Sequence, residues 1–214
     1  MGPEPEPPCE ESAATRGLLE RVAAGDPDAV EDLFARHRPA LVAFVDLRLD
    51  RAVRTRLDAS DVVQEAQAEL ARRMADYLAR RPMPFHLWAR KTAFERLLKA
   101  RRAHRADRRD VAREAAGVDR SSVALAHALV APGPTASEAA AAREAAERVA
   151  RAVEGLSEAD REVLLMRHVE GLSHPEIACL LGIDPAAARQ RYGRALFRLQ
   201  KALGAVGVPG AGHV

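Results

Sequence analysis

Apolar residues recur at three- and four-residue spacing along most of this chain, and this periodicity restricts the fold more than any other feature of the sequence. Much of the apolar content is Ala and Leu, which, like Arg and Glu, are strong helix formers. No convincing run of Val, Ile, Tyr and Thr alternates with polar residues as a half-buried strand requires. The sequence therefore predicts an all-α fold.

Changes in composition and turn-forming residues divide the 214 residues into two helical regions. The clearest break between the two regions is Ala131-Pro132-Gly133-Pro134. We expect two small helical domains joined by a linker with some transient helix. The predicted order is an acidic disordered tail over 1–15, a first domain over 16–105, a linker over 106–136, a second domain over 137–203 and a disordered tail over 204–214.

Charge is distributed unevenly, although the formal net charge is only +2. Residues 1–35 carry nine acids and two bases, whereas residues 80–113 carry twelve Lys or Arg and three acids. A second basic stretch, residues 184–203, has five bases and one acid. Two basic stretches indicate a polyanion that is contacted at two places. The alternative is a solvated, Arg-rich helical surface.

The sequence lacks the residues that several classes of function require. Cys9 and Cys179 lie far apart, without the spacing of a zinc site or a disulfide framework. The sequence has no signal peptide and no run of about 18 apolar residues. It also has no Gly-rich phosphate loop, no HExxH motif and no nucleophile with an evident local partner. We therefore expect a cytoplasmic protein that is not an enzyme and has no cofactor, metal, small-molecule substrate or membrane contact.

The most specific local pattern lies within residues 173–203. Ser173 and Glu176 have the spacing of a capping box at the start of a short, apolar-faced helix, HPEIACLL. Gly182 supplies the positive φ that a sharp turn needs. Asp184 can cap the next helix, which has proline at its first position. A short helix, a Gly turn and a capped basic helix predict a helix-turn-helix.

The last helix has the polar residues that a DNA-reading helix needs. In a helix-turn-helix, the second helix enters the major groove with its N-terminal residues on base edges. Arg can donate bidentately to guanine and Gln to adenine, while other basic residues hold phosphates. From this segment alone, the alternative is an ordinary helical hairpin with a solvated basic face. The residues off the apolar stripe are Arg189, Gln190, Arg191, Arg194, Arg198 and Lys201.

Both halves of the chain resemble one family, the extracytoplasmic-function (ECF) sigma factors of bacterial RNA polymerase. The second half, LSEADREVLLMRHVEGLSHPEIACLLGIDPAAARQRYGRALFRLQKAL, is similar to the family's promoter-reading C-terminal domain. In the first half, LFARHRPALVAFV resembles its first conserved helix, and LDASDVVQEAQAEL its polymerase-binding helix. PFHLWARKTAFERLLKARRAH resembles its promoter-melting segment. The resemblance covers about residues 17–103 and 137–203, and two matches in the right order are more specific than either alone.

The resemblance implies a polymerase-binding surface at the family's D-x-x-Q-E positions. These positions are Asp61, Gln64 and Glu65 in this sequence. Their spacing places them on one exposed helix face, opposite Val62 and Val63. Acids and an amide there suit a basic groove on the largest polymerase subunits. Without the family pattern, a solvated face whose acids the helix dipole favours explains them as well.

The resemblance also implies that the promoter-melting helix contacts the minus-ten element as a single strand. Trp88 and Phe94 could stack on flipped bases, but their spacing beside Leu87, Leu97 and Leu98 favours a place in the core. We expect the basic residues of this helix to contact the strand backbone. They are Arg90, Lys91, Arg96, Lys99, Arg101 and Arg102.

For the minus-thirty-five element, the resemblance assigns DNA contacts to the start of the last helix. Two positions depart from the family pattern, because Ala187 replaces a frequent hydroxyl residue and Gly193 replaces a bulkier one. Phe197 projects away from the apolar stripe and has no assigned role. The expected DNA-binding residues are Ala187, Arg189, Gln190, Arg191 and Arg194.

Together these features predict a sigma factor that binds core RNA polymerase and directs promoter recognition and opening. Its partners would be the polymerase and promoter DNA, and the resemblance leaves an anti-sigma factor open as a further partner. The alternative is a helix-turn-helix regulator that binds DNA without acting as a polymerase subunit. The helix with Asp61, Gln64 and Glu65 discriminates the two, since only a sigma factor needs it. A response regulator would need an α/β receiver in the first half, and no strand pattern is visible there.

Overall fold

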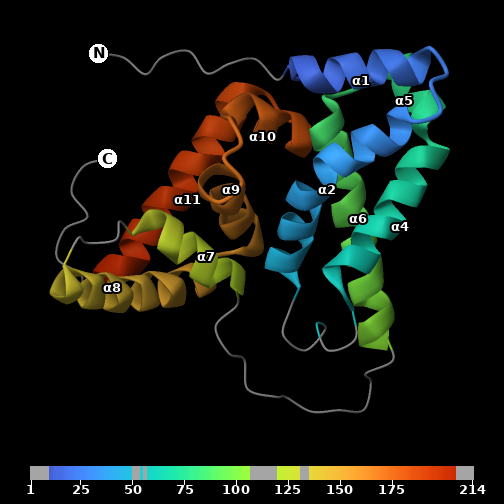
Figure 1. Cartoon of the computed structure of the whole chain (residues 1–214). Coiled ribbons are helices and arrows are strands. Elements are labelled where there is room, and N and C mark those ends of the chain that lie inside the picture. Colours follow the sequence, from blue (N-terminus) through green and yellow to red (C-terminus); the bar gives the residue numbers. More distant parts are fainter. Residues whose placement is uncertain (1–9, 50–53, 55–56, 107–119, 131–134, 206–214) are drawn as a thin grey trace. The chain divides into compact units, whose positions relative to one another are not determined.

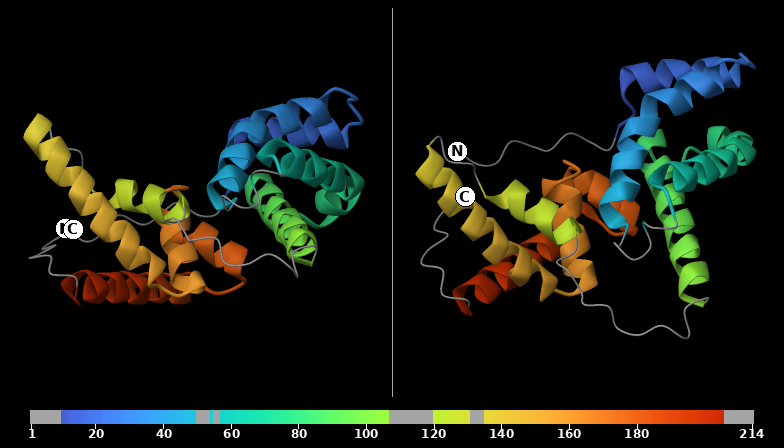
Figure 2. Two further views of the ribbon diagram at one scale, coloured as in Figure 1. Left: turned by 90° about the horizontal axis from the view of Figure 1, so that it is seen from below. Right: turned by 60° about the horizontal axis from the view of Figure 1, so that its bottom comes forward.

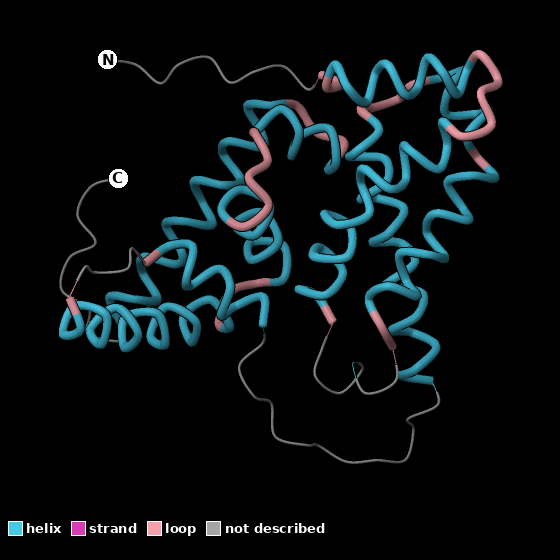
Figure 3. The backbone as a smooth tube through the Cα atoms, viewed as in Figure 1, coloured by secondary structure: helices cyan, strands magenta, loops and turns pink. Residues whose placement is uncertain are grey.

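The computed structural model describes residues 10–49, 54, 57–106, 120–130 and 135–205. Every regular element in these ranges is a helix, as Figure 3 shows, so the predicted all-α fold is confirmed. The described residues separate into two compact units, one that ends at Ala106 and one that begins at Arg120. Each unit has its own apolar core and is described by itself.

The first unit is built on three helices, α2, α4 and α6, that pack on one another around one core (Figure 1). The apolar stripe of α4 enters this core, because Val62, Val63 and Leu70 are at most 2% exposed. Helix α1 packs on α2, and α5 follows α4 directly. The helices of this unit are α1 (Ala13–Ala23), α2 (Ala29–Arg48), α4 (Ala59–Arg72), α5 (Met74–Arg80) and α6 (Phe85–Ala106).

An aromatic cluster joins α5 to the start of α6. The Trp88 ring stacks on Tyr77 with centroids 4.3 Å apart and an interplanar angle of 14°. Phe85 meets both rings edge-on and is fully buried. Trp88 is only 6% exposed, which confirms the interpretation of this residue as core. Phe94 is partly buried and packs edge-on against Phe44, with centroids 6.2 Å apart.

Glu11 corrects the expected extent of the N-terminal tail. It lies within the 1–15 segment predicted to be disordered, yet α1 begins at Ala13 and Ser12 caps it. A Glu11 carboxylate oxygen accepts a hydrogen bond of 2.6 Å from the Phe85 backbone N–H. The first N–H groups of a helix have no partner within it, so this distant carboxylate satisfies one at the start of α6. The rest of the predicted tail, residues 1–9, lies outside the described residues.

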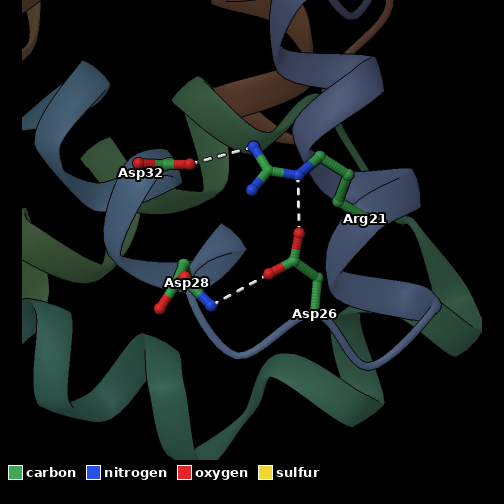
Figure 4. A network of polar contacts seen from close by, with 4 residues as sticks. All are labelled: Arg21, Asp26, Asp28 and Asp32. Atoms are coloured by element: carbon green, nitrogen blue, oxygen red, sulfur yellow. Dashed lines mark hydrogen bonds and ion pairs between the residues drawn. The ribbon is translucent and has the colours of Figure 1, made fainter.

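A surface ion-pair network closes the turn between α1 and α2 (Figure 4). Arg21 donates to Asp26 at 2.7 Å and to Asp32 at 2.9 Å, while Asp26 accepts from the Asp28 backbone N–H at 3.0 Å. The hydrogen bond from Arg21 is the main cause of the lowered pKa of Asp26. These groups are solvent-exposed, so the network orients the turn more than it stabilises the fold.

The second unit packs α11 against α8, α9 and α10, and packs α7 against α8 and α9. In both views of Figure 2, α7 lies beside α8. Leu164, Ile177 and Ala195 are among its fully buried residues. Its helices are α7 (Arg120–Leu129), α8 (Ala136–Glu154), α9 (Glu158–His168), α10 (His174–Leu181) and α11 (Pro185–Ala205).

Helix α7 lies within the 106–136 segment that the sequence predicted to be a linker. Leu125 and Ala126 on α7 are 0% and 1% exposed, and Ala126 packs with Ala146 and Ala150 of α8. The small side chains of these alanines let α7 and α8 approach closely. The packing of α7 therefore depends on residues of α8, about 20 positions later in the sequence. Residues 107–119 and 131–134 of the predicted linker lie outside the described residues.

The end of the second domain can also be compared with the sequence. Helix α11 continues to Ala205, two residues beyond the predicted end of the second domain, and residues 206–214 lie outside the described range. Among the described helices, none is long and apolar enough to cross a membrane.

The contact of Glu11 leads to a stability prediction. Glu11→Ala removes the acceptor from the Phe85 N–H, and loss of a helix-capping acceptor costs about 1 kcal/mol. We expect urea denaturation to show a free energy of unfolding lower by about this amount. Glu10→Ala, at the neighbouring exposed position, is the control. Equal stability of the two variants would show that Glu11 does not cap α6.

Candidate functional site

Helices α10 and α11 form the predicted helix-turn-helix, and both halves of its capping box are present. The Ser173 hydroxyl accepts a hydrogen bond from the Glu176 backbone N–H at 3.3 Å. The Glu176 carboxylate in turn accepts from the Ser173 backbone N–H at 2.8 Å. These reciprocal bonds satisfy two donors that the start of α10 would otherwise leave unpaired. The capping box predicted from the sequence is therefore confirmed.

The turn between α10 and α11 also has the predicted chemistry. Gly182 adopts φ 64° and ψ 36°, the left-handed conformation that glycine reaches without steric cost. The Ile183 N–H then donates to the Ala178 carbonyl at 3.1 Å. Asp184 accepts a hydrogen bond of 2.9 Å from the Ala187 N–H, so it caps α11 at the expected position.

The buried stripe of α11 determines which of its residues face outward. Ala188, Ala195 and Leu199 are at most 4% exposed. Because α11 buries this one side, the structure brings the five predicted minus-thirty-five residues together on its first turns. Arg189, Gln190 and Arg194 are exposed, and Ala187 and Arg191 are half-buried.

A buried carboxylate holds α11 against α9. Both carboxylate oxygens of Asp160, a residue that is 5% exposed, lie 2.7 Å from an Arg198 guanidinium nitrogen. Burial alone would raise the pKa of Asp160, but hydrogen bonds from Ser157 and Arg198 and the charges of Arg198 and Arg191 lower it. Asp160 is therefore ionised at neutral pH and pairs with Arg198, whose side chain is 57% exposed. The sequence pattern gave no signal of this contact, because its partners are 38 residues apart.

A second polar contact holds the middle of α11. The Tyr192 hydroxyl and the His168 Nε2 are 3.0 Å apart, and the His174 ring lies edge-on to Tyr192 at 5.2 Å. Burial raises the pKa of Tyr192 and lowers the pKa of His168, so both side chains are neutral at pH 7. Three helices thus meet at Tyr192, which ties α11 to the end of α9 and the start of α10.

The six basic residues predicted to contact the minus-ten strand do not share one exposed face. Lys91, Lys99 and Arg102 are exposed and Arg101 is half-buried.

The other two basic residues of α6 have contacts within the first unit. Arg90 is only 8% exposed, and its guanidinium lies 4.5 Å from the centre of the Phe44 ring. Arg96 pairs with Glu69 of α4 at 2.7 Å, and its side chain is 23% exposed. Arg90 was predicted to contact the strand backbone, but its side chain is buried in the first unit, where the face of the Phe44 ring attracts the guanidinium charge.

Helix α4 presents the three predicted polymerase-binding residues to solvent. Asp61, Gln64 and Glu65 are exposed, on the side opposite the buried Val62 and Val63. This outward face, named the α4 acidic face here, follows directly from burial of the apolar stripe.

Hydrogen bonds from α2 fix the position of α4. Arg38 donates to the Ser60 hydroxyl and to the Gln67 side-chain oxygen, each at 2.9 Å. The helix begins after Asp58, whose carboxylate accepts from the Ser60 N–H at 2.7 Å. Sequence reasoning did not identify Arg38, which acts from 22 residues away along the chain.

Comparison with known proteins relates both units to one family. Residues 146–199 match the family model described as "Sigma-70, region 4". The chain is 32% identical to the RNA polymerase sigma factor CarQ of Myxococcus xanthus, over 87% of this chain and 95% of that protein. It is 30% identical to the ECF RNA polymerase sigma factor SigD of Mycobacterium tuberculosis, over 89% of this chain and 84% of that protein.

Solved structures show the same architecture. CnrH, solved in complex with the cytosolic domain of CnrY, matches with a TM-score of 0.54 and 25% identity, over 90% of this chain and 99% of that one. The sigma factor RpoE of Bartonella quintana, solved with the anti-sigma factor NepR, matches with a TM-score of 0.50 and 17% identity, over 83% and 98%. The second likeness concerns the fold alone.

The pairing of Asp160 with Arg198 predicts a pH-dependent contribution to stability. Asp160→Asn removes the charge, and a hydrogen bond to a charged group contributes about 1.5–3 kcal/mol. We expect a free energy of unfolding lower by about that amount at pH 7, measured by urea denaturation. The exposed Asp76, which pairs with Arg80, supplies the control Asp76→Asn, for which we expect little change.

The sign of the pH effect follows from the lowered pKa of Asp160. A carboxyl with a lowered folded pKa stabilises the fold above its unfolded pKa, near 3.8, and loses this effect as the pH falls through the folded pKa. The difference between the parent protein and Asp160→Asn should therefore shrink below pH 3.8. A difference that stays constant from pH 7 to pH 3 would contradict this assignment.

Proposed function

The chain belongs to the ECF family of RNA polymerase sigma factors, and we propose that it divides its work among three helix surfaces, on α4, α6 and α11. It directs core RNA polymerase to promoter DNA in transcription initiation. The observation that carries the proposal is the α4 acidic face, Asp61, Gln64 and Glu65. A regulator that binds DNA without the polymerase has no use for this surface.

The α4 acidic face binds core polymerase. Two carboxylates and an amide on one exposed face suit a groove lined by basic side chains, because charge complementarity speeds association and fixes register. The hydrogen bonds from Arg38 support the proposal, because they hold α4 against α2 and so fix the helix that carries the α4 acidic face. A rigid element positions a binding surface better than a loop.

The exposed basic residues of α6 bind the melted strand of the minus-ten element. These residues are Lys91, Lys99 and Arg102, with the half-buried Arg101 beside them, and their charge suits a phosphate backbone. Arg90 and Arg96 contribute indirectly, since they hold α6 to α2 and α4.

The start of α11 binds the minus-thirty-five duplex. Arg189, Gln190 and Arg194 face outward directly after the turn at Gly182, where a helix-turn-helix meets base edges. Arg191 is half-buried, and its guanidinium lies near enough to Asp160 to lower the pKa of that carboxyl. We assign Arg194 and Gln190 to base edges. We assign Arg189 and Arg191 to contacts that flank these edges, chiefly with phosphates.

The mechanism is recruitment and capture of promoter DNA, without catalysis by this chain. It acts where the polymerase acts, in the cytoplasm. An anti-sigma factor is a further partner in this proposal, because the similar CnrH was solved in complex with the cytosolic domain of CnrY, and RpoE in complex with the anti-sigma factor NepR.

Two pairs of substitutions should separate polymerase binding from DNA binding. Arg191→Ala with Arg194→Ala should weaken binding of the assembled holoenzyme to its promoter by about tenfold or more, since the base-edge contact of Arg194 contributes about 1–3 kcal/mol and Arg191 adds a flanking contact. Binding to core polymerase should stay unchanged. Asp61→Ala with Glu65→Ala should do the reverse, weakening capture by immobilised core polymerase.

Circular dichroism and thermal melting of both double variants provide the folding control. If both pairs impaired both activities while remaining folded, the proposed division between α4 and α11 would be wrong.

Salt dependence tests the assignment on α6. Each contact between a basic side chain and a single-strand phosphate contributes about 0.7 to the slope of log affinity against log salt. Lys99→Ala with Arg102→Ala should therefore lower that slope by about 1.4 for holoenzyme on a pre-melted minus-ten fragment. Arg80→Ala, an exposed Arg on α5 that pairs with Asp76, is the matched control. An unchanged slope in the double variant would place the strand elsewhere.

A further inference from the structure

Two residues of α11 have no explanation in the packing of the second unit. A Cβ atom added to Gly193 would meet no heavy atom within 4 Å, so no neighbour requires glycine there. Glycine within a helix is less favourable than alanine. Phe197, one turn later, is 67% exposed, the largest exposure of a large apolar side chain among the described residues. Gly193 thus lowers the stability of α11, and Phe197 leaves an apolar side chain in solvent.

Helix geometry places both residues on the face assigned to DNA. Gln190, Gly193, Arg194 and Phe197 are separated by three or four residues, so they lie on one side of α11. The buried stripe that includes Ala195 faces the other way. Side chains of a helix lean toward its N-terminus, so the Phe197 ring is directed over the turn that holds Gly193. The result is open space above Gly193, called the gap here, with Phe197 one turn farther along the same face.

The position of the gap along α11 fits the major groove. Gly193 is eight residues after Pro185, the first residue of the helix. At about 1.5 Å per residue this is about 12 Å, close to the width of the major groove. Phe197 lies about 6 Å farther along the axis, and its lean toward the N-terminus returns the ring to the level of the gap. Gly193 therefore lies within the length of α11 that the groove can hold, and Phe197 lies one turn beyond it.

The chemistry of the gap selects one feature of the groove. Phosphate and the polar atoms of bases prefer donors such as those of Gln190 and Arg194. The apolar group that a duplex exposes in its major groove is the 5-methyl of thymine, and Phe is among the residues that contact it. We propose that the gap above Gly193, together with Phe197, accepts a thymine methyl in the minus-thirty-five duplex. This inference rests on the proposed function and adds a specificity determinant to it.

The test uses the full chain assembled with bacterial core RNA polymerase. Holoenzyme first selects its upstream element from duplexes with a randomised segment, and each thymine of the selected element is then replaced singly by deoxyuridine, which removes only the methyl. Burial of one methyl corresponds to about a fourfold change in affinity. We expect one replacement to weaken binding by the parent holoenzyme by about fourfold.

The variants identify the residues that hold the methyl. Phe197→Ala and Gly193→Ala should each bind the thymine duplex as weakly as the parent binds the deoxyuridine duplex, and should lose nothing more on that duplex. Phe197 is exposed, and Gly193→Ala raises helix propensity, so neither change should unfold the protein. Gly17→Ala on α1 is the matched control, because an added Cβ there also meets nothing within 4 Å.

The outcomes separate this inference from the proposed function. If Arg194→Ala weakened binding while the parent and Phe197→Ala were equally sensitive to methyl removal, the minus-thirty-five assignment would stand and the thymine site would be wrong. If Phe197→Ala weakened binding to every duplex alike, or capture by core polymerase, the ring would contact another surface and the inference would again fail. If the parent holoenzyme enriched no sequence, both proposals would fall.

Discussion

Burial of one apolar stripe on each helix determines which residues this protein presents to its partners. On α4, the burial of Val62 and Val63 turns the acidic face outward. On α11, the burial of Ala188 and Ala195 turns Gln190 and Arg194 outward. Because side chains on opposite sides of a helix cannot exchange places without losing the core, the hydrophobic effect fixes the functional surfaces as firmly as it fixes the fold.

Polar contacts between distant segments then set the angle and register of each helix. Glu69 pairs with Arg96 between α4 and α6, and Asp160 pairs with Arg198 between α9 and α11. Arg96 and Arg198 belong to basic stretches that composition alone would assign to nucleic acid. In the structure, some basic residues of such a stretch pair with acids on neighbouring helices, and others are exposed and can bind a polyanion. The net charge of the stretch does not distinguish these two groups.

The parts that the sequence predicted correctly depend on neighbours within a few residues. The periodic helices, the capping box at Ser173 and the left-handed turn at Gly182 are of this kind. The parts that it missed depend on contacts far along the chain. Glu11 reaches Phe85 across 74 residues, and Arg90 is buried because Phe44 lies beneath its guanidinium. Helix α7 was assigned to a linker because its packing on Ala146 and Ala150 has no local signal. The roles of the α4, α6 and α11 residues remain predictions.

The central claim is that this chain gives core polymerase its promoter specificity, and run-off transcription tests it most directly. Purified bacterial core RNA polymerase, the full chain and a fragmented genomic promoter pool would be combined, with a parallel reaction that omits the chain. The account predicts discrete transcripts that disappear without the chain and whose start sites share an upstream motif. Absence of such transcripts, together with binding of the chain to duplex DNA but not to core polymerase, would contradict it and favour a regulator that acts on DNA alone.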